Sequence, residues 1–287
     1  MTRRLLAVHA HPDDESSKGA ATYAHYRSTG AAVLVVSCTG GERGDVQNPA
    51  LEPAAMAERD MAGLRRIEMA AAQRALGIQH RWLGYEDSGL PESPAEPLPP
   101  NCFALIALEL SAEPLVKVIR EFRPHVLITY DESGGYPHPD HIRTHELSVF
   151  ARDAAADAAR YPEQGDPWHI PKLYYDRIFT GERATTVHAA MVAAVHPRAA
   201  EMAELVEWMS ERPSLATTQV AVGDFFEARD EALRAHASQV EPQSPFFFWP
   251  NEILRAAWPY EDFQLVDSTV QTQLPETDLF AGIKDTE

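Results

Sequence analysis

The chain has 287 residues, of which 45% are hydrophobic and 24% are charged. This length and composition predict a globular protein with a sizeable core and argue against a disordered or fibrous chain. The formal net charge of -18 argues against nucleic acid as a partner, because phosphate binding needs clustered lysine and arginine.

The first predicted elements are a strand, a helix and a second strand. The apolar run 4–9 predicts a short buried strand, and residues 16–29 predict a helix with Ser16 as N-cap and Gly30 as its stop. Residues 31–39 (AAVLVVSCT) are typical of a strand. Such a succession within about 35 residues predicts a right-handed βαβ unit in a parallel sheet.

The rest of the chain continues this alternation. The segment 87–101 is rich in proline and predicts an irregular loop, whereas 177–222 shows no clear pattern apart from a helix near 198–210. The remaining predicted elements are helices around 56–76, 112–122, 139–159 and 224–239 and strands over 80–85, 125–130 and 172–176.

The predicted fold class is therefore α/β, with a Rossmann-like parallel sheet flanked by helices. We expect one domain over 1–287, in which a core of residues 1–175 carries the metal site and a C-terminal elaboration, 176–287, shapes the substrate pocket. The first apolar run is too short for a signal peptide, and no stretch approaches the ~18 apolar residues that span a bilayer. With only two cysteines as well, a cytoplasmic protein without a membrane partner is expected.

Two polar clusters follow predicted strands. His11-Pro12-Asp13-Asp14 follows the strand 4–9, and the segment 136–141 (YPHPDH) follows the strand 125–130. Ligands of open α/β sheets bind outside the carboxyl ends of the strands, so the clusters could converge despite ~125 residues of separation. A solvated turn and helix cap is the alternative for the first cluster alone, but the joint occurrence favours a metal site.

Three protein ligands and an open position for water define a catalytic zinc site. His11, Asp14 and a histidine of the second cluster meet this requirement, and we predict His141 as the third ligand. Asp13 then remains as the base that accepts a proton from the attacking water. Pairing His141 with His145 would resemble a zinc peptidase, but the intervening residues lack the required glutamate. Fe²⁺ is an alternative to Zn²⁺ with these donors.

The other residues of the second cluster have two interpretations. His138 and Asp140 could form a histidine–carboxylate pair that protonates a leaving amine, or they could belong to a turn fixed by the neighbouring prolines. Tyr136 could donate to an oxyanion or be a loop aromatic.

At these residues the sequence resembles the LmbE-like family of zinc N-deacetylases, and more closely its mycothiol S-conjugate amidase branch. ALRAHASQ and DLFAGI near the C-terminus are also similar to that branch, whereas 177–222 matches no stretch of the family pattern. The main matching stretches are AVHAHPDDESSKGAAT, TGGERGD, RRIEMAAAQRALG, LGYEDSGLP, REFRPHV and YDESGGYPHPDHIR.

The resemblance implies a Rossmann-like fold and roles for individual residues. It implies zinc ligands at His11, Asp14 and His141, with Asp13 as the general base. The further roles it implies are a general acid or electrostatic stabiliser at His138, its modulator at Asp140, a contact to the tetrahedral intermediate at Tyr136, and substrate contacts at Lys18, Arg65 and Asp87. A solvated helix lysine is the alternative for Lys18.

The expected function follows from the resemblance. The substrate would be a small molecule, a thiol conjugate of a sugar-inositol, whose amide bond is hydrolysed to a mercapturic acid and glucosaminyl-inositol in detoxification or natural-product biosynthesis. One alternative is deacetylation of N-acetylglucosaminyl-inositol. Another is a metal- or sugar-binding module without catalysis, against which the retained Asp13 argues. No oligomeric state is predicted.

Overall fold

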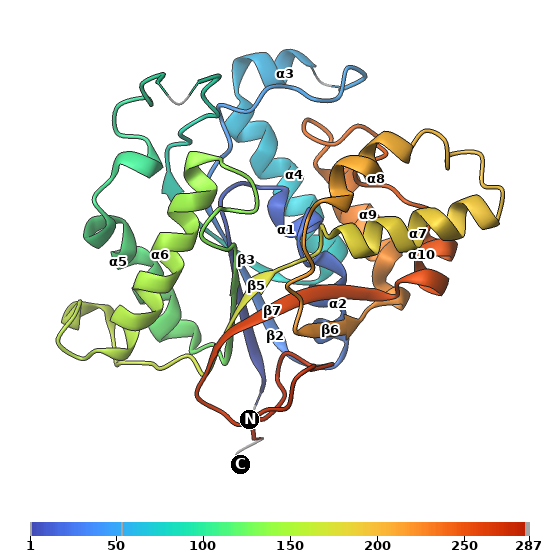
Figure 1. The fold of residues 1–287 in the computed structure, drawn as a ribbon. Helices are drawn as coiled ribbons and strands as arrows, with labels where there is room; N and C mark the ends of the chain where they lie inside the picture. Colours follow the sequence, from blue (N-terminus) through green and yellow to red (C-terminus); the bar gives the residue numbers. More distant parts are fainter. Residues whose placement is uncertain (1, 53, 94, 285–287) are drawn as a thin grey trace.

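The structure is a computed structural model that describes residues 2–52, 54–93 and 95–284. A seven-stranded sheet runs through the molecule and carries helices on both faces (Figure 1). Its strands are β1 (Arg4–His9), β2 (Ala32–Thr39), β3 (Gln79–Tyr85), β4 (Val126–Thr129), β5 (Lys172–Asp176), β6 (Thr218–Ala221) and β7 (Tyr260–Ser268). They are ordered β3-β2-β1-β4-β5-β7-β6.

The α/β class with a mostly parallel sheet flanked by helices is confirmed, and one edge of the sheet is antiparallel. The part β3-β2-β1-β4-β5 is parallel, whereas β7 pairs antiparallel with both β5 and β6. The buried parallel strands β1, β2 and β4 are mostly apolar, with polar residues chiefly at their ends. Strand β7 mixes buried and exposed residues and lacks that signal, so it was not predicted.

The helices are α1 (Asp14–Ser17), α2 (Ala20–Ser28), α3 (Ala54–Arg59), α4 (Met61–Leu76), α5 (Leu108–Phe122), α6 (Pro139–Ala156), α7 (Gly181–Ala193), α8 (Ala203–Ser210), α9 (Phe226–Ala235) and α10 (Asn251–Ala257). Gly77 ends α4 in the left-handed conformation, as a C-terminal glycine should. The predicted helix 16–29 is instead two helices, because Gly19 has a φ of 121° that no helix accommodates. Ser16 therefore lies inside α1 and is not its cap.

Two further segments differ from the prediction. The unplaced stretch 177–222 contains α7, α8 and β6, and of these only α8 was expected. The predicted helix 224–239 ends at Ala235, so the following residues form a turn. No helix in the described part of the chain is long and apolar enough to cross a membrane.

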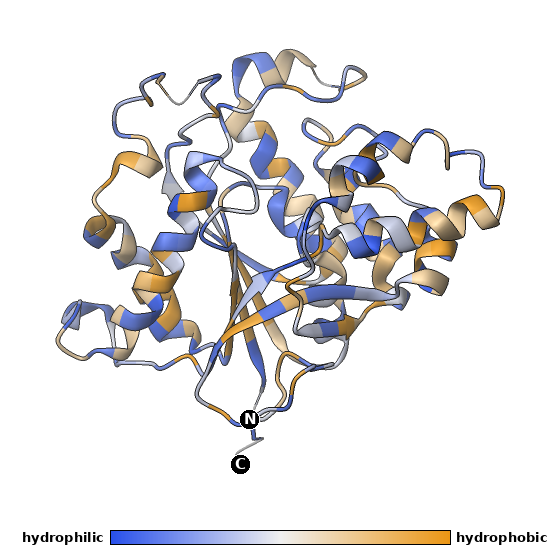
Figure 2. Cartoon of the chain, viewed as in Figure 1, coloured by the Kyte–Doolittle hydropathy of each residue, from blue (hydrophilic) through white to orange (hydrophobic). Residues whose placement is uncertain are grey.

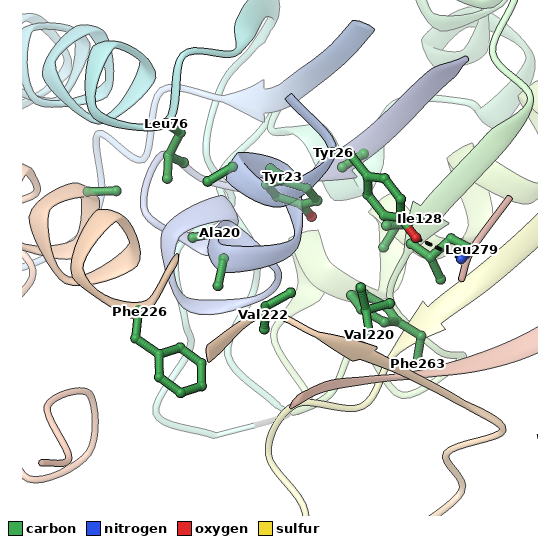
Figure 3. Close-up of a cluster of buried hydrophobic side chains, with 14 of the residues drawn as sticks. Ala20, Tyr23, Tyr26, Leu76, Ile128, Val220, Val222, Phe226, Phe263 and Leu279 are labelled. Atoms are coloured by element: carbon green, nitrogen blue, oxygen red, sulfur yellow. Dashed lines mark hydrogen bonds between the residues drawn. The ribbon is translucent and has the colours of Figure 1, made fainter. Parts of the chain in front are cut away.

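Hydrophobic residues are frequent in the central strands and alternate with hydrophilic residues along the helices around them (Figure 2). The larger buried cluster joins both ends of the chain: it includes Tyr23 and Tyr26 of α2, Val220 of β6, Phe263 of β7 and Leu279, whose backbone N–H donates to the Tyr26 hydroxyl (Figure 3). A second cluster on the other face of the sheet packs β1, β2 and β4 against α5 and α6. This core fixes the strand ends from which the candidate site is built.

Candidate metal centre and active site

The two polar clusters lie at neighbouring strand ends. Strands β1 and β4 pair in parallel, so the turn after His9 and the loop after Thr129 leave the sheet at the same edge. The first turn leads into α1 at Asp14, and the second leads into α6 at Pro139. The structure thus brings together the segments that the sequence placed at one edge.

His11, Asp14 and His141 form a buried group whose potential ligand atoms all lie within 4.8 Å of one another. Asp14 Oδ2 is 3.6 Å from His11 Nδ1 and 3.4 Å from His141 Nε2. His141 Nδ1 donates to the Gly134 carbonyl at 2.9 Å, which leaves Nε2 as the unprotonated nitrogen. That buried Nε2 makes no hydrogen bond to any described residue. Two imidazoles and one carboxylate that converge in this way are suitable ligands for a divalent metal such as zinc.

Asp140 contacts His11 through its carboxylate. Asp140 Oδ2 accepts from His11 Nε2 at 3.2 Å and from the backbone N–H of Ser88 at 2.9 Å, and the Ser88 hydroxyl donates to Oδ1. His138 instead accepts from the backbone N–H of Asp140 at 3.1 Å and so caps α6. This hydrogen bond fits the turn interpretation of the segment, and the role of His138 stays a prediction. The Asp140 carboxylate is positioned to orient His11, a candidate ligand.

Among the described residues a second group of potential metal ligands consists of His11, His138 and Asp140, and Asp13 belongs to neither group. Its backbone has a φ of 123°, which costs a non-glycine residue roughly 1–3 kcal/mol and persists only when its surroundings enforce it. The guanidinium of Arg65 bonds the Pro12 carbonyl at 2.5 Å and Asp13 Oδ2 at 3.0 Å. Burial raises the pKa of Asp13, and the Arg65 charge opposes this rise. A carboxylate with a raised pKa suits a proton acceptor.

His138 and Tyr136 lie beside the candidate ligands. Burial lowers the pKa of His138 to about 4, so its imidazole is neutral near pH 7. The His138 and His11 ring centroids are 4.6 Å apart, and the Tyr136 ring meets that of His141 at 4.5 Å. Tyr136 is 40% exposed and lines the adjoining cavity.

The three predicted substrate contacts are placed differently from one another. Lys18 lines the cavity, and its ammonium bonds Asp14 Oδ1 at 2.5 Å. Arg65 and Asp87 are each only 3% exposed, and neither lines the cavity. Arg65 instead holds Asp13, and Asp87 accepts from the backbone N–H groups of Arg43 and Gly89.

A cavity of about 710 Å³ opens beside the site. The charged residues that line it are Asp13, Asp14, Lys18, Asp131, Asp176, Arg177 and Arg212. Its apolar wall includes Phe179, Trp208, Leu215, Val240, Phe246 and Phe247. The segment 177–222, which the sequence could not place, therefore supplies much of this wall.

Sequence reasoning missed Asp176, which ends β5 at the same sheet edge. Burial raises the pKa of its carboxyl to about 7, and the charges of Lys18 and Arg177 oppose this rise. The signal was present, because KLYYD was predicted as a strand and residues that end parallel strands line the ligand crevice.

Comparisons with known proteins agree with this geometry. The family model described as PIG-L, GlcNAc-PI de-N-acetylase, matches residues 6–152. The chain is 49% identical to a mycothiol S-conjugate amidase of Streptomyces coelicolor, over 98% of each chain. It is 40% identical to a 1D-myo-inositol 2-acetamido-2-deoxy-alpha-D-glucopyranoside deacetylase of Streptomyces avermitilis, over 98% of this chain and 97% of that one.

The fold is also similar to that of a solved structure, N,N'-diacetylchitobiose deacetylase from Pyrococcus horikoshii. The TM-score is 0.60 at 18% identity, and the match covers 92% of this chain and 84% of the other. At this identity the likeness bears on the fold, and it agrees with the observed α/β architecture.

Proposed function

Because this chain belongs to the PIG-L family, GlcNAc-PI de-N-acetylase, and is a hydrolase that acts on amide bonds, we propose that it hydrolyses mycothiol S-conjugates. The products would be a mercapturic acid, which is an N-acetylcysteine S-conjugate, and glucosaminyl-inositol. The observation that carries this choice of substrate is the cavity of about 710 Å³ with its aromatic wall. An acetyl group would leave most of such an apolar wall without contact.

We propose that His11, Asp14 and His141 hold a zinc ion, or Fe²⁺ with the same donors. Bound there, the metal would polarise the amide carbonyl and lower the pKa of a water molecule toward ~7. His141 Nε2 supports this assignment. It is buried and has no hydrogen-bond partner among the described residues, and buried polar atoms normally have a partner, which the metal would provide.

The remaining steps fall to side chains of the chain itself. Asp13 takes the proton of the attacking water, which its raised pKa favours. Tyr136 donates a hydrogen bond to the carbonyl oxygen as that oxygen gains negative charge. His138, neutral near pH 7, hydrogen-bonds the leaving group, and the proton held by Asp13 passes to the departing amine nitrogen.

The two parts of the cavity suit the two parts of the substrate. The hydroxyl groups of a sugar-inositol would find partners in Lys18, Asp131 and Asp176. An apolar thiol-linked group would pack against Trp208 and Phe247. The conjugates expected from this wall are those of apolar electrophiles, whether they arise in detoxification or in natural-product biosynthesis.

Mass spectrometry of reaction products tests the proposal. Zinc-loaded protein is incubated in parallel with a mycothiol conjugate that carries an aromatic S-substituent and with N-acetylglucosaminyl-inositol. We expect the N-acetylcysteine conjugate to be released with the higher kcat/KM. Release of acetate alone would favour the deacetylase, and inertness toward both amides would favour a binding module.

A further inference from the structure

His236 lies in the turn that follows α9, within the stretch ALRAHASQ that no proposed step uses. Its side chain is fully buried, as is that of Glu15 in α1, and the two meet across 221 positions of the chain. His236 Nε2 is 2.7 Å from Glu15 Oε1. A buried carboxylate needs such a partner, because an uncompensated buried charge is strongly unfavourable.

Glu15 contacts both His236 and Asp13. Glu15 Oε2 accepts the backbone N–H of Asp13 at 2.9 Å, so two side chains connect the C-terminal part of the chain to the candidate base. The bond acts on the residue whose φ is 123°. A non-glycine residue keeps such a conformation only when neighbouring groups hold it there.

The same turn is fixed from a second side. Glu68 of α4 accepts both the backbone N–H and the hydroxyl of Ser238, each at 2.7 Å. Three residues earlier on α4, Arg65 bonds the carboxylate of Asp13 at 3.0 Å. The turn 236–238 and α4 thus hold Asp13 at its N–H and at its carboxylate.

We propose that His236 is a positioning residue, which acts through Glu15 to keep the Asp13 carboxylate directed into the cavity. The inference rests on the proposed role of Asp13 as the base, but it does not depend on which amide is the substrate. Without the His236 contact, Glu15 would be a buried charge with one partner fewer, and the backbone of Asp13 could relax to a negative φ.

Kinetics of two His236 variants test this. His236→Ala removes the donor to Glu15, whereas the amide of His236→Gln can still donate from nearly the same place. With whichever amide the wild-type protein hydrolyses fastest, His236→Ala should lower kcat about 10- to 100-fold with KM and bound zinc little changed. His236→Gln should recover most of the loss. Wild-type kcat in His236→Ala, or no recovery in His236→Gln, would overturn the proposal.

A matched control separates positioning from general destabilisation. Tyr26→Phe also removes buried hydrogen bonds, since the Tyr26 hydroxyl donates to Asp278 Oδ1 and accepts from the Leu279 backbone N–H, but it does so at the far end of α2. It should lower Tm and leave kcat unchanged. If Tyr26→Phe lowers kcat as much as His236→Ala does, the His236 effect is merely structural and the proposal fails.

Two further measurements are available: Glu15→Gln does not depend on the first variant, and a crystal structure does not depend on activity. If His236→Ala does not fold, Glu15→Gln keeps the side-chain size and should lower kcat with zinc retained; wild-type kcat would contradict the proposal. A crystal structure of either variant should show Asp13 outside the positive-φ region. An unchanged φ at Asp13 would overturn the inference even if the substrate proposal is correct, and a relaxed φ would support it even if that proposal fails.

Discussion

Asp140 shows how local spacing misleads at the scale of single residues. Its separation of one residue from His138 suggested a pair, yet its carboxylate bonds His11, which lies 129 positions away. Pro139 starts α6 and His138 caps it by accepting the Asp140 backbone N–H, so the bond between these two neighbours is made by the Asp140 backbone. Residue types predicted the candidate ligands, but which carboxylate serves which histidine is a tertiary contact that spacing does not specify.

Asp140→Ala should therefore weaken zinc binding. Loss of a carboxylate that orients a ligand histidine typically lowers metal affinity about 10- to 100-fold. Competition with a zinc chelator measures this effect directly. The control is His145→Ala, also on α6, whose Nδ1 contacts the Tyr130 carbonyl and not the candidate ligands. Equal zinc affinity in wild type and Asp140→Ala would contradict the assignment.

Asp176 predicts a dependence of stability on pH. Burial raises its folded-state pKa to about 7, above the ordinary value of 3.8, so its contribution is fully present below the ordinary pKa and is lost as pH rises through 7. Asp176→Asn removes this loss. Its Tm should exceed that of the wild type at pH 8, and calorimetry should show the difference shrinking toward pH 5. A difference independent of pH would show that titration of Asp176 is not the cause.

At the scale of elements, the sequence predicted what local chemistry decides. Gly77 ends α4 as expected, and the buried strands β1, β2 and β4 can be recognised in the sequence as mostly apolar segments. Helix α7 was missed although its buried residues recur at three- to four-residue spacing, because short side chains there gave a weak pattern. Strand β7 depends on pairing with two strands distant in sequence, which no local pattern encodes.

The loop between β4 and α6 offers a matched pair of glycines. Gly134 and Gly135 have φ values of 72° and 75°, so alanine at either is strained by roughly 1 kcal/mol. A Cβ on Gly134 would come within 2.6 Å of His141 Cβ, whereas one on Gly135 meets nothing. Both variants should lose stability in calorimetry, but only Gly134→Ala should lose zinc affinity. Equal affinities would show that this loop does not position His141.

Helix α8 should influence selection of the thiol-linked group. Trp208 is 52% exposed and lines the cavity, with the Arg212 guanidinium 4.2 Å from its ring centroid. Trp208→Ala should raise KM for a conjugate with an aromatic substituent about three- to tenfold and leave that for a methyl conjugate nearly unchanged. Val192→Ala on the neighbouring α7 is exposed outside the cavity and is the control. Equal changes in KM for both conjugates would show that α8 does not select the thiol-linked group.

At the scale of the whole molecule, the candidate site draws on distant parts of the chain. The turn after β1, the start of α1 and α6 supply the candidate ligands, α4 and the turn after α9 hold Asp13, and α8 and the segment 240–247 complete the cavity. The sequence predicted the first of these, since ends of parallel strands meet. It could not predict the others, because they depend on how the C-terminal half packs. Whether residues 1–287 behave as one folding unit stays a prediction.

The residues of the cluster His11-Pro12-Asp13-Asp14 have separate proposed roles: His11 and Asp14 hold the metal, and Asp13 acts as the base. Metal content and turnover, measured together on Asp13→Ala and His11→Ala, test these roles most directly. Asp13→Ala should keep bound zinc and lose turnover about 10²- to 10⁴-fold, whereas His11→Ala should lose the zinc itself. Equal loss of zinc from both variants, or wild-type turnover in Asp13→Ala, would contradict the account.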